Sequence, residues 1–216
     1  MFQRRVPEGE AIDGLRERKK RETRSALAWS AVRLAVEHGF ANVRVEDIAA
    51  GAGVSPRTFN NYFSSKAEAI VARHVDRLQA VAAELRAQPA DAEIWAALCE
   101  AAISQFAWDD DDAPPHPLWS AGVKLMVSEP AVQAELLHRS RLVEHEISVA
   151  IAARLGGDDA LSAGLIAAAV GAVIHVSLEQ WLASDQRLSL GQVMRRAFER
   201  MGHVAGARRY QSVDAP

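Results

Sequence analysis

The sequence predicts an all-α fold, and three observations support this prediction. Apolar residues recur at helical spacing over most of the chain, no sustained alternation of apolar and polar residues marks a strand, and caps and stops separate the helical segments. The 216 residues are 49% apolar, which is enough to bury a core without disulfides. The single cysteine, Cys99, rules out an intrachain disulfide and fits a reducing compartment.

The N-terminal region is expected to hold a tail followed by two helices. Residues 1–14 contain a proline and two glycines with little apolar periodicity, and we expect them to form a mobile tail. Apolar residues then recur at helical spacing from Leu15 to His38, where Gly39 is a suitable stop. A second, short helix is expected from Val45 to about Gly51.

A tight turn separates this short helix from the next one. Gly53 lies in the turn, where a glycine is favoured because it adopts backbone conformations that other residues resist. Ser55 is a good N-cap and Pro56 suits the first helical position, so a helix is expected from Pro56 to about Tyr62. Two helices joined by such a turn are typical of a helix–turn–helix.

A long helix is expected to connect two parts of the chain. Ser65 and Glu68 form a capping box, S-x-x-E, and the apolar pattern continues to about Arg86, shortly before Pro89. An acidic, proline-rich loop is expected over 109–117. Further helices are expected at about 91–108, 117–128, 130–155, 158–183 and 189–207, and residues 209–216 are expected to form a tail.

One of these helices has the composition of a membrane span. Ala160 to Leu178 contains no charged residue and approaches the length needed to cross a bilayer. Its alanines and glycines transfer weakly into lipid, and a helix that is apolar on all sides is normally buried in protein. We therefore expect a buried helix and no membrane partner. The first ten residues hold no apolar leader segment, and a cytoplasmic location is expected.

Charge is distributed unevenly along the chain. The net charge is −3, but residues 1–86 carry 15 Lys and Arg against 11 Asp and Glu, whereas residues 87–216 carry 10 against 17. Six basic side chains fall within residues 16–24. Such an excess is typical of a segment that faces nucleic acid, although a solvated helix start has the same pattern.

The residues around the tight turn resemble a known family. From Ile48 onward the pattern I-A-x-x-A-G-V-S-x-x-T-F-x-x-Y-F-x-S-K is similar to the DNA-binding domain of TetR-family transcriptional regulators, and the resemblance covers about residues 18–78. It implies about nine helices, a homodimer, and a C-terminal domain that binds a small effector. It also implies transcriptional regulation, usually repression that the effector relieves.

This resemblance suggests a division of the chain into three parts. Residues 15–63 would form a three-helix DNA-binding domain with the helix–turn–helix, residues 64–86 the connecting helix, and residues 87–208 an effector-binding and dimerisation domain. The partners expected on this basis are double-stranded operator DNA, a second copy of the chain, and a small, largely apolar effector.

The second helix of the helix–turn–helix, expected from Pro56 to about Tyr62, would read DNA in the major groove. Arg57 can pair with guanine, and Asn60 and Asn61 can pair with adenine. Donors on neighbouring positions suit phosphate oxygens. The expected DNA-binding set is Arg44, Ser55, Pro56, Arg57, Thr58, Asn60, Asn61, Tyr62 and Lys66, in which Thr58, Tyr62 and Lys66 are the expected phosphate donors.

Two positions depart from the family's pattern. Arg44 stands where members usually have a Thr or Ser that caps the helix and contacts phosphate, and an arginine reaches phosphate but cannot cap. Asn60 stands where a Tyr is frequent, which favours base reading over a backbone contact at that position. The variant S-P-R-T-F-x-N-Y-F is similar to an actinobacterial branch, some of whose members respond to acyl-CoA or other lipid-like effectors.

Aromatic and apolar residues after Pro89 predict an effector pocket, since small-molecule sites combine apolar walls with a few polar groups. Plain core packing is the alternative for each residue taken singly. The expected lining is Trp95, Phe106, Trp119, Met126 and Leu142, with His145 and His175 as polar contacts.

The last two helices are expected to form a dimer interface, because two helices from each of two subunits make a four-helix bundle. Packing within one chain is the alternative. The expected interface residues are Gly164, Ala168 and Ala172 on the first helix, with Val193, Ala197 and Met201 on the second.

Catalytic and cofactor motifs are absent from the sequence. It contains no nucleophile elbow, H-E-x-x-H or P-loop, and the glycines at 51 and 53 follow a helix and lack the third glycine of a dinucleotide loop. The histidines have no metal-ligand spacing. We therefore expect no enzyme activity, cofactor or metal. An all-α carrier of small molecules or lipids, without a role in DNA regulation, remains the alternative function.

Overall fold

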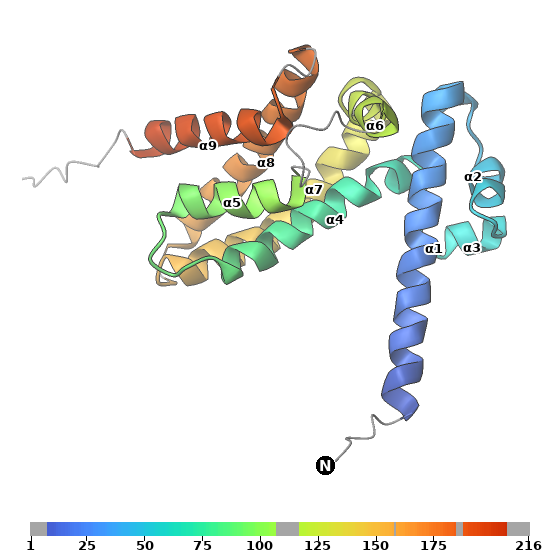
Figure 1. Ribbon diagram of the computed structural model, residues 1–216, viewed down its shortest axis with the longest axis horizontal. Coiled ribbons are helices and arrows are strands. Elements are labelled where there is room, and N and C mark those ends of the chain that lie inside the picture. The colour runs from blue at the N-terminus through green and yellow to red at the C-terminus, as the bar shows by residue number, and fades with distance from the viewer. Residues whose placement is uncertain (1–7, 107–116, 158, 185–187, 207–216) are drawn as a thin grey trace, which may run out of the picture.

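The computed structural model describes residues 8–106, 117–157, 159–184 and 188–206, and these are helical throughout (Figure 1). The order of elements is α1 (Glu8–His38), the 3-10 turn η1 (Phe40–Asn42), α2 (Val45–Gly51), α3 (Pro56–Asn60), α4 (Lys66–Ala87), α5 (Ile94–Phe106), α6 (Pro117–Ser128), α7 (Pro130–Arg154), α8 (Ala160–Ala183) and α9 (Leu190–Gly206). The described chain therefore has nine α-helices and no strand, as expected.

The helices form two packed groups. Helices α1, α2 and α3 make a small unit in which Leu27, Ile48 and Phe59 are buried together. Helix α4 packs against α1 at one end and then runs between α5 and α7. Helices α7, α8, α9 and α5 complete the larger bundle, and α6 bridges the groups by packing against both α1 and α7 (Figure 1).

The N-terminal helix begins earlier than the sequence predicts. Helix α1 starts at Glu8, so the expected tail over 8–14 is wrong, and residues 1–7 lie outside the described part. A glycine lowers helix stability by about 1 kcal/mol relative to alanine. Gly9 and Gly14 do not end the helix, because the strong helix formers of the following basic run continue it. Its N-terminal half extends away from the rest of the molecule (Figure 1).

Most other helix boundaries follow local signals. Ser55 and Ser65 cap α3 and α4, accepting hydrogen bonds from the backbone N–H groups of Thr58 and Glu68 at 3.1 and 3.0 Å. Helix α3 ends at Asn60, slightly before the expected Tyr62. The described residues do not include the expected acidic loop over 109–117, except for its last residue. They also do not include the expected C-terminal tail over 209–216.

Helix α8 is long and apolar enough to cross a membrane by length and composition, with a mean hydropathy of 2.0 over its most apolar window. It packs against α6, α7 and α9 instead. One face is buried, and its Trp181 ring lies edge-on to Trp119 of α6 with 4.9 Å between the ring centroids. This packing is that of a core helix in a helical bundle.

Candidate nucleic-acid interface and effector cavity

Helices α2 and α3 form the predicted helix–turn–helix. Ile48 and Ala49 of α2 and Phe59 of α3 are fully buried against α1 and α4. Gly53 in the turn has φ +69°, a left-handed conformation that favours glycine. The Ser30 hydroxyl of α1 donates to the Ile48 carbonyl at 3.0 Å. These contacts hold α3 on a fixed support.

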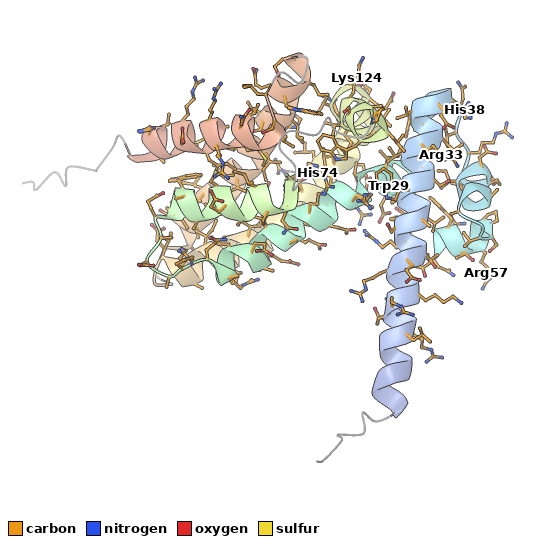
Figure 2. The ribbon with its side chains drawn as sticks, viewed as in Figure 1. Trp29, Arg33, His38, Arg57, His74 and Lys124 are labelled. Carbon is orange, nitrogen blue, oxygen red and sulfur yellow. The ribbon has the colours of Figure 1, made fainter. Side chains whose placement is uncertain are left out.

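Helix α3 turns its polar side chains toward solvent. Arg57, Asn60 and Asn61 are exposed, while Phe59 between them is buried. Arg57 lies on the outer side of α3, away from the C-terminal bundle (Figure 2). Ser55 and Pro56 begin the helix as predicted. Asn60 and Asn61 follow Arg57 by three and four positions, a spacing that places the three residues on one side of a helix.

All three expected phosphate donors have other contacts. The Thr58 hydroxyl lies 2.9 Å from the Ser55 hydroxyl, and Tyr62 is half-buried against the core. Lys66 departs most from expectation, because its Nζ donates to the carbonyls of Phe40 at 2.7 Å and Val43 at 2.9 Å and lies 4.4 Å from the Phe40 ring centroid. Its ammonium group therefore closes the end of η1 rather than extending from the surface.

The start of α2 is capped by a residue that the sequence analysis did not single out. Arg44 occupies the N-cap position without a capping side-chain bond, and its backbone N–H donates to the Asp47 carboxylate at 3.2 Å. Asp47 thus supplies half of a capping box. The acidic residue three positions after Arg44 was the available signal. The Arg44 side chain is exposed near the start of α2.

The basic run of α1 is partly engaged within the protein. Arg24 pairs with Asp76 of α4, and its guanidinium carbon lies 5.4 Å from the Phe63 ring centroid. Arg18 and Lys20 make only loose pairs with Glu22 and Glu17, at 3.6 and 3.9 Å. The side chains of residues 16–21 are exposed on the extended half of the helix.

An ion-pair network joins the start of α4, directly after the helix–turn–helix, to α7. Arg139 of α7 contacts Glu68 at 2.8 Å and Glu135 at 2.7 Å. The other Glu68 oxygen accepts hydrogen bonds from the Ser64 backbone N–H at 2.7 Å and hydroxyl at 2.6 Å. The chain that leaves α3 is therefore tied to α7 through one partly buried carboxylate, that of Glu68.

Three of the seven predicted pocket residues come together. Phe106, Trp119 and Met126 line a cavity between α1, α4, α5, α6 and α8. Residues before Pro89, which were not expected in the pocket, form the remaining part of the cavity wall. The added lining residues include Trp29 and Val32 of α1 and Arg73, His74 and Arg77 of α4.

The other four predicted pocket residues are not among the described lining residues of this cavity. Trp95 packs in a separate cleft between α5 and α9. Leu142 is 60% exposed and His145 is exposed, because both fall on the outer side of α7. His175 is about half exposed and lies 3.4 Å from Glu179. Helical spacing places residues on a face, but it does not tell which face meets a neighbour.

Burial shapes the charge of the cavity. It lowers the pKa of His74 to about 3, with smaller contributions from Arg77 and His175, so the imidazole is neutral at pH 7. Burial and the neighbouring Arg73 lower the pKa of Arg77 to about 10, and burial lowers that of Arg73. Both guanidiniums stay charged at pH 7. Two charged guanidiniums therefore line the cavity, and the nearby Asp76 raises the pKa of Arg73 against the effect of burial.

Four of the six predicted interface residues line one groove between α8 and α9. Val193, Ala197 and Met201 line an open apolar groove of about 580 Å³ with Ala172. Ala168 is exposed, and a Cβ on Gly164 would meet nothing within 4 Å. Val204, which also lines the groove, is 73% exposed, and Leu161 near the start of α8 is 75% exposed. Among the described residues, no group of three His, Cys, Asp or Glu side chains is placed to hold a metal.

Comparison with known proteins identifies two family segments. Residues 30–72 match the model of bacterial regulatory proteins of the tetR family, and residues 92–206 match the model of the MftR C-terminal domain. The chain is 32% identical to the HTH-type transcriptional regulator TcmR of Streptomyces glaucescens over 173 residues, which are 78% of this chain and 76% of that protein.

Solved structures show the same fold. The fatty acid degradation regulator FadR of Bacillus halodurans superposes with a TM-score of 0.54 at 16% identity, covering 88% of this chain and 97% of that one. SmeT, the repressor of the Stenotrophomonas maltophilia multidrug efflux pump SmeDEF, has a TM-score of 0.54 at 19% identity, covering 90% and 98%. By its two family segments and its similarity to TcmR, the chain belongs to the TetR family of transcriptional regulators, whose members are DNA-binding regulators rather than enzymes.

Proposed function

We propose that this protein is a cytoplasmic, ligand-responsive repressor that binds a palindromic operator as a homodimer and leaves it when a small, largely apolar effector binds. The observation that carries the proposal is the outer face of α3. Arg57, Asn60 and Asn61 are exposed there on a helix that Phe59 anchors in the core.

The chemistry of this face suits base reading. An arginine pairs bidentately with guanine, and asparagines pair with adenine, through the edges exposed in the major groove. The exposed basic side chains over 16–21 on α1 suit phosphate oxygens of the same duplex. The Lys66 ammonium group does not take part in these contacts, because it donates to the Phe40 and Val43 carbonyls.

Dimerisation would use α8 and α9. Val204 lies exposed in the groove that Val193, Ala197 and Met201 line, and Leu161 is a second exposed apolar side chain, near the start of α8. A second copy would cover this surface and form a four-helix bundle. A two-fold dimer presents two reading helices, which fit half-sites about 34–36 Å apart.

Release by an effector requires that the effector binds more tightly to one position of helices α1–α3, relative to the larger bundle, than to another. The cavity between α1, α4 and α6 supports this role, because its walls come from both groups of helices. A coupling of about 1–3 kcal/mol would change operator affinity by about 5- to 150-fold. Helix α4 is the direct link, because it continues from the helix–turn–helix into the bundle.

Fluorescence anisotropy with a labelled duplex from upstream of the protein's own gene tests DNA reading. Arg57→Ala and Asn61→Ala should each weaken binding by about 5- to 150-fold, because a base contact contributes about 1–3 kcal/mol. Arg86→Ala, at the exposed far end of α4, is the matched control and should bind as wild type. Wild-type affinity in both α3 variants would contradict the assignment of the reading face.

The carrier alternative predicts a different result in the same assay. In a repressor, the ligand and the operator change each other's affinity by the same factor. In a carrier, added duplex would leave ligand affinity unchanged, and wild-type protein would show no preference among duplexes.

A further inference from the structure

The start of α4 holds the helix–turn–helix from two sides. On one side, the Lys66 ammonium group donates to the Phe40 and Val43 carbonyls, which belong to the segment that leads into α2. On the other side, the Glu68 carboxylate accepts hydrogen bonds from the backbone N–H and the hydroxyl of Ser64, in the turn that follows α3. The position of α2 and α3 is therefore fixed relative to the first turn of α4.

The Arg139 side chain of α7 reaches this same turn of α4. Its Nη2 lies 2.8 Å from Oε1 of Glu68, whereas Ser64 donates to the other oxygen of that carboxylate. Its Nε donates to Glu135, one turn earlier on α7, at 2.7 Å. Because a guanidinium is planar and presents its N–H groups in fixed directions, the two contacts together orient Arg139. The C-terminal bundle thereby holds the residue that fixes the turn after α3.

Helix packing places Arg139 where it can make this contact. Val132 and Leu136 precede it by seven and three positions, so the three residues lie on one side of α7, and the two apolar ones are buried in the core. Helix α7 packs along α4 (Figure 1). The Glu68 and Arg139 side chains are only 14% and 30% exposed. Solvent therefore screens this pair less than it screens the pairs on the open surface.

The ion pair is sensitive to small movements of α7. A hydrogen bond between charged groups is about 2.7–2.9 Å long and is lost by about 3.6 Å. A displacement of α7 by about 1 Å relative to the start of α4 would therefore break the pair, unless the side chains follow it. Packed helices in allosteric proteins shift by about 1–2 Å, which is enough to open this contact.

We propose that the Arg139–Glu68 ion pair is a latch that positions α3 for DNA binding. While the latch is closed, the bundle holds the helix–turn–helix in the arrangement that binds the operator, and its loss weakens operator binding without changing which bases are read. Neither side chain contacts DNA, so both are positioning residues that act through Ser64 and the turn after α3. The proposal rests on the reading of DNA by α3 given above and adds how the C-terminal bundle controls it.

A double-mutant cycle on operator affinity tests this latch. Fluorescence anisotropy with a labelled duplex from upstream of the protein's own gene compares the full-length wild type, Glu68→Gln, Arg139→Gln and the double variant. Glu68→Gln removes the charge but keeps an oxygen that accepts from Ser64. Each single variant should bind the operator about three- to tenfold more weakly, as expected for a partly buried pair. The double variant should bind about as weakly as either single one, because one interaction is lost in all three.

Two readouts separate positioning from other roles of Arg139. The salt dependence of operator binding should be the same in Arg139→Gln as in the wild type, whereas loss of a phosphate contact would lower the slope by about one. A base-pair change in the operator should also weaken both proteins by the same factor, whereas Arg57→Ala should reduce this discrimination. Urea denaturation establishes that each variant is folded at the temperature of the binding measurement.

Matched variants make the result specific. Glu135→Gln removes the partner of Arg139 on α7 but leaves its contact with Glu68, and Arg141→Gln removes an exposed arginine from the same helix. Both should bind the operator within about twofold of the wild type. Arg139→Lys keeps the positive charge and should recover part of the affinity lost in Arg139→Gln. Arg139→Met is a second neutral replacement of similar length and takes the place of Arg139→Gln in the cycle if that variant does not fold.

The outcomes separate this inference from the proposed function. Wild-type operator affinity in the folded neutral variants, a double variant whose loss is the product of the single losses, or a smaller salt slope in the Arg139 variant would overturn the latch. Each of these results, together with tight operator binding by the wild type, would leave the repressor intact. A wild-type protein without preference among duplexes would instead refute the repressor, and the latch with it.

Discussion

Gly122 of α6 offers a direct test of the contact between the two groups of helices. A Cβ added there would lie 2.9 Å from Cγ1 of Val32 on α1, and Val32 is only 7% exposed. Two carbon atoms in ordinary contact are about 3.5–4.0 Å apart. Gly122→Ala therefore requires α1 and α6 to separate by about 0.6 Å or more, or Val32 to change its rotamer.

The magnitude follows from two opposing effects. Overpacking a well-packed core destabilises a protein by about 1–3 kcal/mol. Replacing a glycine inside a helix by alanine stabilises it by about 0.5–1 kcal/mol. We expect Gly122→Ala to lower the free energy of unfolding by up to about 2.5 kcal/mol, the difference between these effects. Val32→Ala removes the clashing methyl group and should relieve the cost in the double variant.

The assay is a double-mutant cycle by urea denaturation at one protein concentration. We expect the double variant to be more stable than the sum of its single changes predicts, by about 1–3 kcal/mol. Gly171→Ala is the control, since its Cβ would meet only the Glu144 carboxylate at 4.0 Å, and it should not destabilise the protein. Additive effects, within about 0.5 kcal/mol, would refute the close approach of α1 and α6.

Two further predictions concern Lys66 and His74. Lys66→Met should lower the free energy of unfolding by about 1–3 kcal/mol, because it removes the ammonium group that donates to the Phe40 and Val43 carbonyls. It should keep the salt dependence of operator binding unchanged. A salt slope smaller by about one in anisotropy titrations would instead identify Lys66 as a phosphate contact. The folded-state pKa of His74 is about 3, below its ordinary value of 6.5. As the pH falls, the imidazole is therefore protonated in the unfolded chain before it is protonated in the folded one. The free energy of unfolding consequently decreases as the pH falls from 6.5 toward 3. Between pH 7.5 and 5.5 the wild type should lose about 1.4 kcal/mol more than His74→Gln in urea denaturation, and equal losses would show that His74 titrates normally when folded.

Helix boundaries could be predicted where the signal is local. Ser55 and Ser65 cap the helices that follow them, and Pro130 begins α7, because each acts on backbone groups within a few residues. The start of α1 at Glu8 was missed because a glycine lowers helix stability without forbidding a helix. Asp47 was missed as the partner of the Arg44 backbone N–H, although its spacing was visible.

Contacts between distant segments could not be predicted. Phe106 and Trp119 were recognised as pocket residues, but the arginines beside them belong to α4 and Trp29 belongs to α1. Leu142 was assigned to the same pocket and lies on the surface. The helical period of 3.6 residues defines a face, yet the crossing of helices decides whether that face meets a neighbour, solvent or a second chain.

By itself, the sequence determined the helical class, the helix–turn–helix and the family, because periodicity, caps and a compact motif are properties of neighbouring residues. Only the tertiary structure decided that Lys66 binds carbonyls and that Arg73 and Arg77 border an aromatic cavity. The physical reason is that these environments are assembled from helices far apart in the chain, so burial and charge there depend on packing geometry.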